Sequence, residues 1–257
     1  MEPMCGRYAS SRKPEDLVEL FEVKSWNAQE ALVADYNVAP TKDVYAVLER
    51  PLRELGPDPV RQLRVLRWGL VPSWAKDPGV GVKMFNARAE TIHEKPAYRR
   101  AFTTRRCLLP ADGYFEWHTP EKEPGQKKAP KKQPYFVTPK DGSEMAFAGL
   151  YEFWRDRNIP EEDPAAWLTT CTVVTTAAEP ELAAVHPRMP LVLPRDRWDD
   201  WLDRSRTDAD ELQALLAPPT PGLMELRPVG AAVGNFRNNG PGLLERVEPE
   251  EIEETLF

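Results

Sequence analysis

The chain has 257 residues, of which 41% are hydrophobic, and a formal net charge of −7. This length and composition are sufficient for one domain with a substantial core, and no run of about 18 apolar residues predicts a membrane span. The three cysteines lack C-x-x-C spacing and the three histidines are scattered, so we expect no disulfide framework, no metal site and no cofactor, and a reducing, cytoplasmic location.

The first predicted element is a helix over residues 14–21, where Pro14 occupies the first turn and acidic residues precede apolar residues at helical spacing. Apolar or alternating runs bounded by Pro, Gly or Asp predict strands over 44–48, 63–68, 106–117, 135–138, 145–154, 167–176 and 189–193. Helical composition predicts further helices over 95–103, 180–185, 195–202 and 208–216. Because these elements do not alternate regularly as in βαβ units, we expect an α+β fold with a largely antiparallel sheet.

Two Pro-rich stretches, 50–61 and 119–134, are predicted to be surface insertions, because neither contributes large apolar side chains to a core. The second contains five lysines and follows a strand ending in Glu116-Trp117, so we expect it to form a mobile loop near that strand's end. Residues 242–257 form an acidic C-terminal tail.

The charge is unevenly distributed along the chain. Residues 83–106 contain seven Lys and Arg against two Glu, and residues 119–134 contain five Lys against two Glu. Acidic residues predominate over 199–211 and in the tail. The overall negative charge therefore does not exclude an anionic partner for the two basic stretches.

Cys5 directly follows Met4 near the start of the chain. As a first residue it would carry an α-amine and a thiol that can attack one aldehyde, the amine forming an imine and the thiol closing a five-membered thiazolidine. Both groups titrate close enough to neutral pH to be partly nucleophilic. This chemistry requires translation to begin at Met4, our working start, or removal of residues 1–4, which do not resemble a signal peptide. Otherwise Cys5 is a small, buried and inert residue.

Seven short segments are rich in residue types that are common at functional sites. In chain order they are Met4-Cys5-Gly6-Arg7-Tyr8, Tyr36-Asn37-Val38-Ala39-Pro40-Thr41, Arg67-Trp68-Gly69-Leu70-Val71-Pro72-Ser73-Trp74, Phe85-Asn86-Ala87-Arg88-Ala89-Glu90-Thr91, Pro110-Ala111-Asp112-Gly113-Tyr114-Phe115-Glu116-Trp117, His186-Pro187-Arg188-Met189-Pro190 and Asn235-Phe236-Arg237-Asn238-Asn239-Gly240-Pro241. Together and in this order they resemble the SOS-response-associated peptidase (SRAP) family, whose domain protects abasic sites in DNA. The resemblance implies a single SRAP-type domain over 4–241, with a barrel-like sheet flanked by helices.

The resemblance also implies a monomer that recognises abasic sites in single-stranded DNA, shields them in the DNA damage response by a covalent bond through the terminal cysteine, and associates with the nucleoid when bound. The family's catalytic positions fall on Cys5, Asn86, Glu116 and His186. An abasic deoxyribose opens to an aldehyde at C1′, and a partly buried Glu116 can move protons to and from the carbinolamine. His186 can protonate the departing ring oxygen or a 3′ phosphate oxygen, and Asn86 can hold the sugar hydroxyl or the amine.

The predicted DNA contacts are Arg7, Pro40, Trp68, Trp74, Arg88 and Arg188. The three arginines lie within the catalytic motifs and are expected to bind the phosphates that flank the lesion. Trp68 and Trp74 bracket a predicted Gly-Pro turn and are expected to stack on exposed bases. Since an abasic site has no base edge to read, we expect little sequence preference.

Two other classes of function fit the same residues. The first is an N-terminal-nucleophile or cysteine peptidase, acting on itself or on other proteins, with Cys5 as nucleophile, His186 as base and Glu116 or Asn86 as the orienting group. The second is a non-covalent binder of single-stranded DNA in which Cys5 is buried and inert. Only covalent capture of an abasic site gives a DNA adduct that resists denaturation.

Overall fold

The structure is a computed structural model that describes residues 5–52, 54–120, 131–218 and 220–248. The strands in these ranges are β1 (Tyr8–Ser10), β2 (Ser25–Trp26), β3 (Asp35–Val38), β4 (Asp43–Leu52), β5 (Gly56–Trp68), β6 (Asn86–Arg88), β7 (Arg106–Ala111), β8 (Gly113–His118), β9 (Gln133–Pro139), β10 (Met145–Arg155), β11 (Trp167–Ala177), β12 (Arg188–Pro190) and β13 (Met224–Pro228). The helices are α1 (Pro14–Leu20), α2 (Arg99–Thr104), α3 (Pro180–Ala183), α4 (Trp198–Leu202) and α5 (Ala209–Ala214). Short 3-10 helices are η1 (Ala28–Glu30), η2 (Pro78–Lys83), η3 (Pro164–Ala166), η4 (Arg195–Arg197), η5 (Ala231–Gly234) and η6 (Pro241–Leu244).

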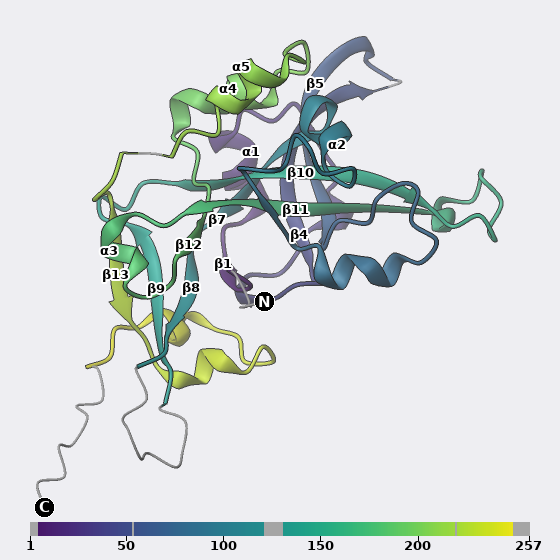
Figure 1. Cartoon of the computed structure of the whole chain (residues 1–257). Coiled ribbons are helices and arrows are strands. Elements are labelled where there is room, and N and C mark those ends of the chain that lie inside the picture. The colour runs from purple at the N-terminus through teal and green to yellow at the C-terminus, as the bar shows by residue number, and fades with distance from the viewer. Residues whose placement is uncertain (1–4, 53, 121–130, 219, 249–257) are drawn as a thin grey trace, which may run out of the picture.

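Five strands close into a barrel. β4 pairs with β5 and β7, β7 with β10, and β10 with β11, all antiparallel. The circle closes through a short parallel pairing of β5 with β11, at Arg67↔Thr170 and Trp68↔Cys171. Figure 1 shows β10 and β11 side by side across the centre of the molecule. The predicted α+β fold with a largely antiparallel, barrel-like sheet is therefore confirmed.

A second, antiparallel sheet lies beside the barrel, in the strand order β13-β9-β8-β1-β3. The chain passes from the barrel into this sheet at Asp112, between β7 and β8, so the prediction of one strand over 106–117 is wrong. Gly113 begins β8 where a Cβ atom would lie 2.2 Å from Cζ of Phe136, and only glycine permits this approach. The break in the strand places Glu116 in the second sheet rather than in the barrel wall.

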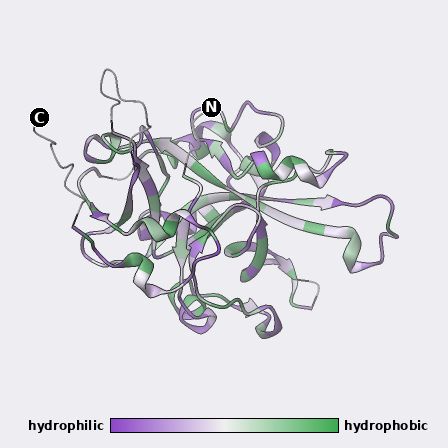
Figure 2. Ribbon diagram, turned by 90° about the horizontal axis from the view of Figure 1, so that it is seen from below, coloured by the Kyte–Doolittle hydropathy of each residue, from purple (hydrophilic) through white to green (hydrophobic). Residues whose placement is uncertain are grey.

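Two large apolar clusters hold the layers together. One joins α1, α2 and α4 to the barrel through the buried aromatic residues Phe21, Phe102, Trp198 and Trp201. The other lies between the barrel and the second sheet and contains the buried side chains of Tyr8 and Tyr114. Hydrophobic residues recur along the central strands in Figure 2, whereas hydrophilic residues concentrate in the peripheral loops. The second cluster also includes Cys5, one of the predicted catalytic residues.

Several predicted boundaries differ from the structure. Residues 50–52 and 56–61 are not a separate insertion but the outer end of the β4–β5 hairpin, whose bend includes Gly56 at a φ of +102°. Pro51 lies directly opposite Pro59, an arrangement that fits a non-hydrogen-bonded pair because neither residue has an N–H group to donate. The helix predicted over 95–103 is shorter in the structure and begins at Arg99.

The stretch predicted as an insertion at 119–134 lies largely outside the described residues, and Gln133 and Pro134 already belong to β9. Of the predicted acidic tail, only residues 242–248 are described. No described helix is long and apolar enough to cross a membrane.

Candidate active site

The four predicted catalytic residues come from four separate segments. Cys5 precedes β1, Asn86 begins β6, Glu116 lies in β8 and His186 lies between α3 and β12. Pairing of β1 with β8 brings the first strand beside Glu116, and parallel pairing of β6 with β11 fixes Asn86. β12 pairs with the end of the same β11 strand. Because β11 carries both β6 and β12, it aligns Asn86 with the segment that holds His186.

Cys5 is tied to Asn86 through its main chain. Asn86 donates from Nδ2 to the Cys5 carbonyl oxygen over 3.0 Å. The Tyr98 hydroxyl donates to the Asn86 carbonyl oxygen over 3.2 Å, and burial raises the pKa of Tyr98 to about 12. A phenol with such a pKa stays protonated at neutral pH and remains a donor, so it holds the main chain of Asn86 in place.

Glu116 is the second partner of Cys5. Its side chain is 6% exposed, and this burial raises the pKa of Glu116 to about 8. The main-chain N–H groups of Cys5 and Trp117 hydrogen-bond to the carboxylate and lower its pKa in part. The main-chain nitrogen of Cys5, which would be the amine of a terminal cysteine, therefore lies within hydrogen-bond reach of a carboxyl group that titrates near neutral pH.

The Cys5 thiol is 2% exposed, and it is a free thiol, as are those of Cys107 and Cys171. Burial raises the pKa of the Cys5 thiol well above its ordinary value, and the nearby Glu116 carboxylate raises it further. The thiol is therefore protonated at neutral pH in this environment, in contrast to the activated thiolate of a cysteine hydrolase.

His186 is half-buried, and the main chain of Arg188 contacts its Nδ1 through a nitrogen at 3.1 Å and an oxygen at 2.9 Å. Nε2 has no hydrogen-bond partner among the described residues. His186, Glu116 and Tyr114 line one small cavity. The structure thus brings His186 and Glu116 to the same small cavity, and Nε2 is buried there without a hydrogen-bond partner among the described residues.

The three arginines predicted to bind phosphate differ in their exposure and in their hydrogen bonds to other protein groups. Arg88 is exposed on β6. Arg7 donates from Nη1 to Asn37 Oδ1 and to the Val233 carbonyl oxygen, each over 2.8 Å. Burial lowers the pKa of Arg7, although a guanidinium remains charged at neutral pH.

Arg188 is engaged with protein groups on two sides. Its Nη2 lies 3.0 Å from Glu90 Oε2 and 2.7 Å from the Thr175 carbonyl oxygen. The pair lowers the pKa of Glu90, so both partners are charged at neutral pH. Contact between Arg188 and a phosphate would compete with this pair, whereas Arg88 forms no ion pair with any residue that the structure describes.

The prediction that Trp68 stacks on bases does not agree with the structure, because Trp68 ends β5 and its side chain is 1% exposed. Its Nε1 donates to the carbonyl oxygen of Phe85, the residue before Asn86, over 2.8 Å. Its main-chain oxygen accepts from Thr41, next to the half-buried Pro40. From inside the core, Trp68 therefore positions the segment of Pro40 and the segment that leads to Asn86. Trp74, in contrast, is 65% exposed.

The structure adds residues to which we assigned no role from the sequence. Asn37 is fully buried and, besides accepting from Arg7, donates from Nδ2 to main-chain oxygens of the segment 233–238. The sequence signal for Asn37 was its place in the Tyr36–Thr41 segment. Tyr98 gave no such signal, because its role depends on where β6 falls in the fold. Within the described residues, no cluster of three His, Cys, Asp or Glu side chains is placed to hold a metal ion.

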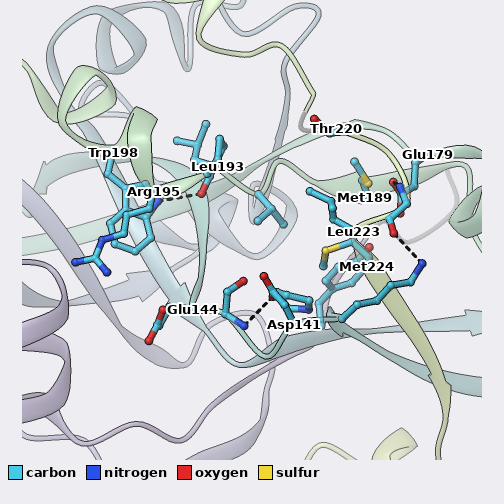
Figure 3. A pocket seen from close by; sticks show the side chains of 17 residues that line it. Asp141, Glu144, Glu179, Met189, Leu193, Arg195, Trp198, Thr220, Leu223 and Met224 are labelled. Atoms are coloured by element: carbon cyan, nitrogen blue, oxygen red, sulfur yellow. Dashed lines mark hydrogen bonds between the residues drawn. The ribbon is translucent and has the colours of Figure 1, made fainter.

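Tyr114 also lines a second pocket, of about 330 Å³, which Figure 3 shows. Met189, Leu193, Trp198 and Met224 give it an apolar lining, and Glu179 lies at one side. It shares only Tyr114 with the cavity of Glu116 and His186. This pocket is thus separate from the cavity that the predicted catalytic residues Glu116 and His186 line.

The chain is similar to several known proteins. The family model described as SOS response associated peptidase (SRAP) matches residues 4–236. The abasic site processing protein YoqW of Bacillus subtilis is 37% identical over 94% of this chain and 99% of its own length. YedK of Escherichia coli, also an abasic site processing protein, is 30% identical over 95% of this chain and 100% of its own. A crystal structure of a protein from Bacteroides thetaiotaomicron shares the fold, with a TM-score of 0.76 over 95% of this chain and 100% of that chain at 24% identity.

Proposed function

The chain belongs to the SOS response associated peptidase (SRAP) family, and on that basis we propose that it recognises abasic sites in single-stranded DNA and captures them covalently through Cys5, thereby shielding them in the DNA damage response. Relatives that match over nearly their whole length are named abasic site processing proteins. The observation that carries the covalent step is the hydrogen bond between the Cys5 main-chain nitrogen and the buried Glu116 carboxylate.

The proposed reaction begins with the ring-opened abasic sugar. The free α-amine of Cys5 adds to the C1′ aldehyde, Glu116 moves a proton to the carbinolamine hydroxyl, and water leaves to give an imine. The thiol then adds across the C=N bond, forming the C–S bond while its proton passes to nitrogen, and the thiazolidine closes. A group with a pKa of about 8 can both accept and donate protons in these steps at neutral pH.

The other residues have supporting roles in this proposal. Asn86 holds the Cys5 carbonyl and so fixes the direction of the α-amine. His186 Nε2, which is buried without a hydrogen-bond partner among the described residues, protonates the ring oxygen as the sugar opens. Arg88 contacts a flanking phosphate, and Trp74 contacts a base beside the gap, because both are exposed.

The test uses a single-stranded oligonucleotide in which a uracil has been removed by uracil glycosylase. Protein that begins at Cys5, with its first residue verified by intact mass, should give a protein–DNA band that survives denaturation. The same protein with undamaged DNA, and protein that retains residues 1–4, should give none. Absence of the band from Cys5-terminal protein on abasic DNA would refute the proposal.

A cysteine peptidase is the competing function, and the site offers it less support. Such an enzyme needs a thiolate or a thiol paired with a base. Here burial and Glu116 raise the pKa of the Cys5 thiol. A neutral thiol suits the second step of thiazolidine formation, in which the imine is already the electrophile.

A further inference from the structure

A groove lined by four arginines lies outside the candidate active site. Two adjoining hollows share Arg50, Arg100, Arg105 and Phe153, and they extend to Arg204 at one end and to Trp167 at the other. We call these six residues the arginine groove. They come from the end of β4, from α2 and the residue after it, from the outer ends of β10 and β11, and from the segment after α4. In Figure 1, α2 lies above β10 near the β4–β5 hairpin.

The residues that line the groove carry more positive than negative charge. Glu152 is the only carboxylate among its lining residues in the described part of the chain, and it pairs with Arg105 over 3.0 Å. Arg50 lies over the Phe153 ring, 4.9 Å from its centroid, and Arg204 Nε is buried without a hydrogen-bond partner among the described residues. Four cations facing one acid repel one another, so an anion in the groove would be stabilised.

Three of the arginines lie close to the side chain of Tyr151. Burial raises the pKa of Tyr151, whose side chain lines the groove, and the charges of Arg204, Arg50 and Arg105 oppose that shift. Three guanidinium groups therefore lie close enough to one phenol to act on it together. Arginine is well suited to phosphate, because its planar fork can donate two parallel hydrogen bonds to phosphate oxygens.

Aromatic and hydroxyl groups complete the groove at its other end. Trp167 is 44% exposed, and Ser73 and Thr169 line the same hollow. Ser73 precedes the exposed Trp74 in a loop that accepts a hydrogen bond from Trp154 at Ala75. Cations that follow a backbone, combined with exposed aromatic rings, are typical of grooves that bind a single nucleic-acid strand.

The groove is too far from Cys5 to hold the lesion itself. Asn86 pairs with Val173 in β11, and Trp167 lies six residues earlier in the same strand. At about 3.3 Å per residue, the two points are roughly 20 Å apart along the strand. A strand that kept the spacing of about 3.4 Å per nucleotide found in duplex DNA would need about six nucleotides to cover that distance, and a more extended single strand would need fewer.

We propose that the arginine groove binds the phosphate backbone of the same single DNA strand at a distance from the abasic site. This inference rests on the proposed function for the identity of the strand, but the binding itself needs neither a lesion nor Cys5. The groove would extend the contact beyond the lesion and would raise the affinity for long strands over short ones.

The test compares abasic and undamaged oligonucleotides of 5 and 25 nucleotides, with the abasic site at the centre. The groove variant is Arg100→Gln with Arg204→Gln, and the charge-matched control is Lys13→Gln with Lys24→Gln, which replaces exposed cations on either side of α1. On the 25-mers, the groove variant should bind at least threefold more weakly than wild type, and its log–log salt slope should be lower by about 0.7 per lost phosphate contact. The control variant should match wild type on every oligonucleotide, and all three proteins should give equal crosslink yields on the abasic 5-mer.

Trp167→Ala separates stacking from charge. It should weaken binding to the 25-mer while leaving the salt slope unchanged, because an indole neutralises no phosphate. An unchanged salt slope in the arginine variant, or equal losses on both lengths, would overturn the inference. Calorimetric binding of inorganic phosphate to wild type but not to the variant, without any effect of DNA length, would also overturn it in favour of a free-phosphate site. If no protein crosslinks the abasic 5-mer while undamaged 25-mers still distinguish the variants, the proposed function fails and the groove stands.

Discussion

Glu116→Gln should remove a marked pH dependence of stability. Burial raises the pKa of Glu116 to about 8, against an ordinary value of 4.5, so the folded protein binds this proton more tightly than the unfolded chain does. The contribution of Glu116 to the free energy of unfolding is therefore highest below pH 4.5, falls by about 1.4 kcal/mol per pH unit as the pH rises towards 8, and levels off above 8. The full loss is on the order of 4–5 kcal/mol, an upper bound because burial of this group is incomplete.

Urea denaturation at pH 5, 6, 7, 8 and 9 measures this effect, on protein that retains residues 1–4. The Gln variant lacks the ionisable group, so its stability relative to wild type should grow steadily between pH 5 and 8. Glu90→Gln is the matched control. Its partner Arg188 lowers the pKa of Glu90, so the stability that Glu90 contributes is lost only as the pH falls below about 4.5. Wild type and the Glu90 variant should therefore give parallel curves from pH 5 to 8.

Parallel curves for wild type and Glu116→Gln over that range would refute the reasoning. A further comparison follows from the hydrogen bond between the Cys5 nitrogen and Glu116. In protein that begins at Cys5, this nitrogen is an amine that carries a positive charge when protonated. Such a charge favours the carboxylate and lowers its pKa. The slope between pH 5 and 8 should then be smaller than in protein that retains residues 1–4.

Four other substitutions test the site. Cys5→Ala at a free N-terminus keeps the amine, so a borohydride-trapped imine should still form on abasic DNA while the adduct that survives without reduction is lost. His186→Gln should slow crosslinking by about 10²–10⁴-fold between pH 6 and 8 with unchanged affinity for abasic DNA, and an equal loss of affinity would indicate a positioning role instead. Trp68→Ala should lower the free energy of unfolding by about 3–5 kcal/mol, because the ring is buried, whereas Trp74→Ala should change it by less than about 0.5 kcal/mol and weaken DNA binding instead.

The fold class was predictable because the apolar and alternating runs that indicate strands are pronounced. The passage of the chain from the barrel strand β7 to β8 in the second sheet was not predictable. Asp112-Gly113 interrupts the apolar run over 106–117 with a pair that is typical of turns, but a local turn signal does not show that the chain passes into a different sheet there. The short strand β6 also gives little signal, since three residues show no period. Its position is fixed by pairing with β11, which lies almost ninety residues away in the sequence.

The site residues were predicted from motifs, and the structure brings Cys5, Asn86 and Glu116 into direct contact. Sequence alone did not distinguish the two tryptophans, because both flank Gly and Pro residues that predict a turn. Trp68 is buried because β5 extends to that residue and its indole N–H finds the Phe85 carbonyl. Burial depends on packing between distant segments, and a local pattern does not report it.

The closure of the barrel through β5 and β11 has a consequence for synthesis of the chain. Cys5 is made first, whereas β11, which carries β6 on one side and β12 on the other, follows more than 160 residues later. At about 5–20 residues per second, roughly 10–40 s pass between translation of Cys5 and translation of His186. During that interval the nascent chain has Cys5 without the full set of its neighbours, so under the proposed mechanism selective reaction would require the last third of the domain to have emerged.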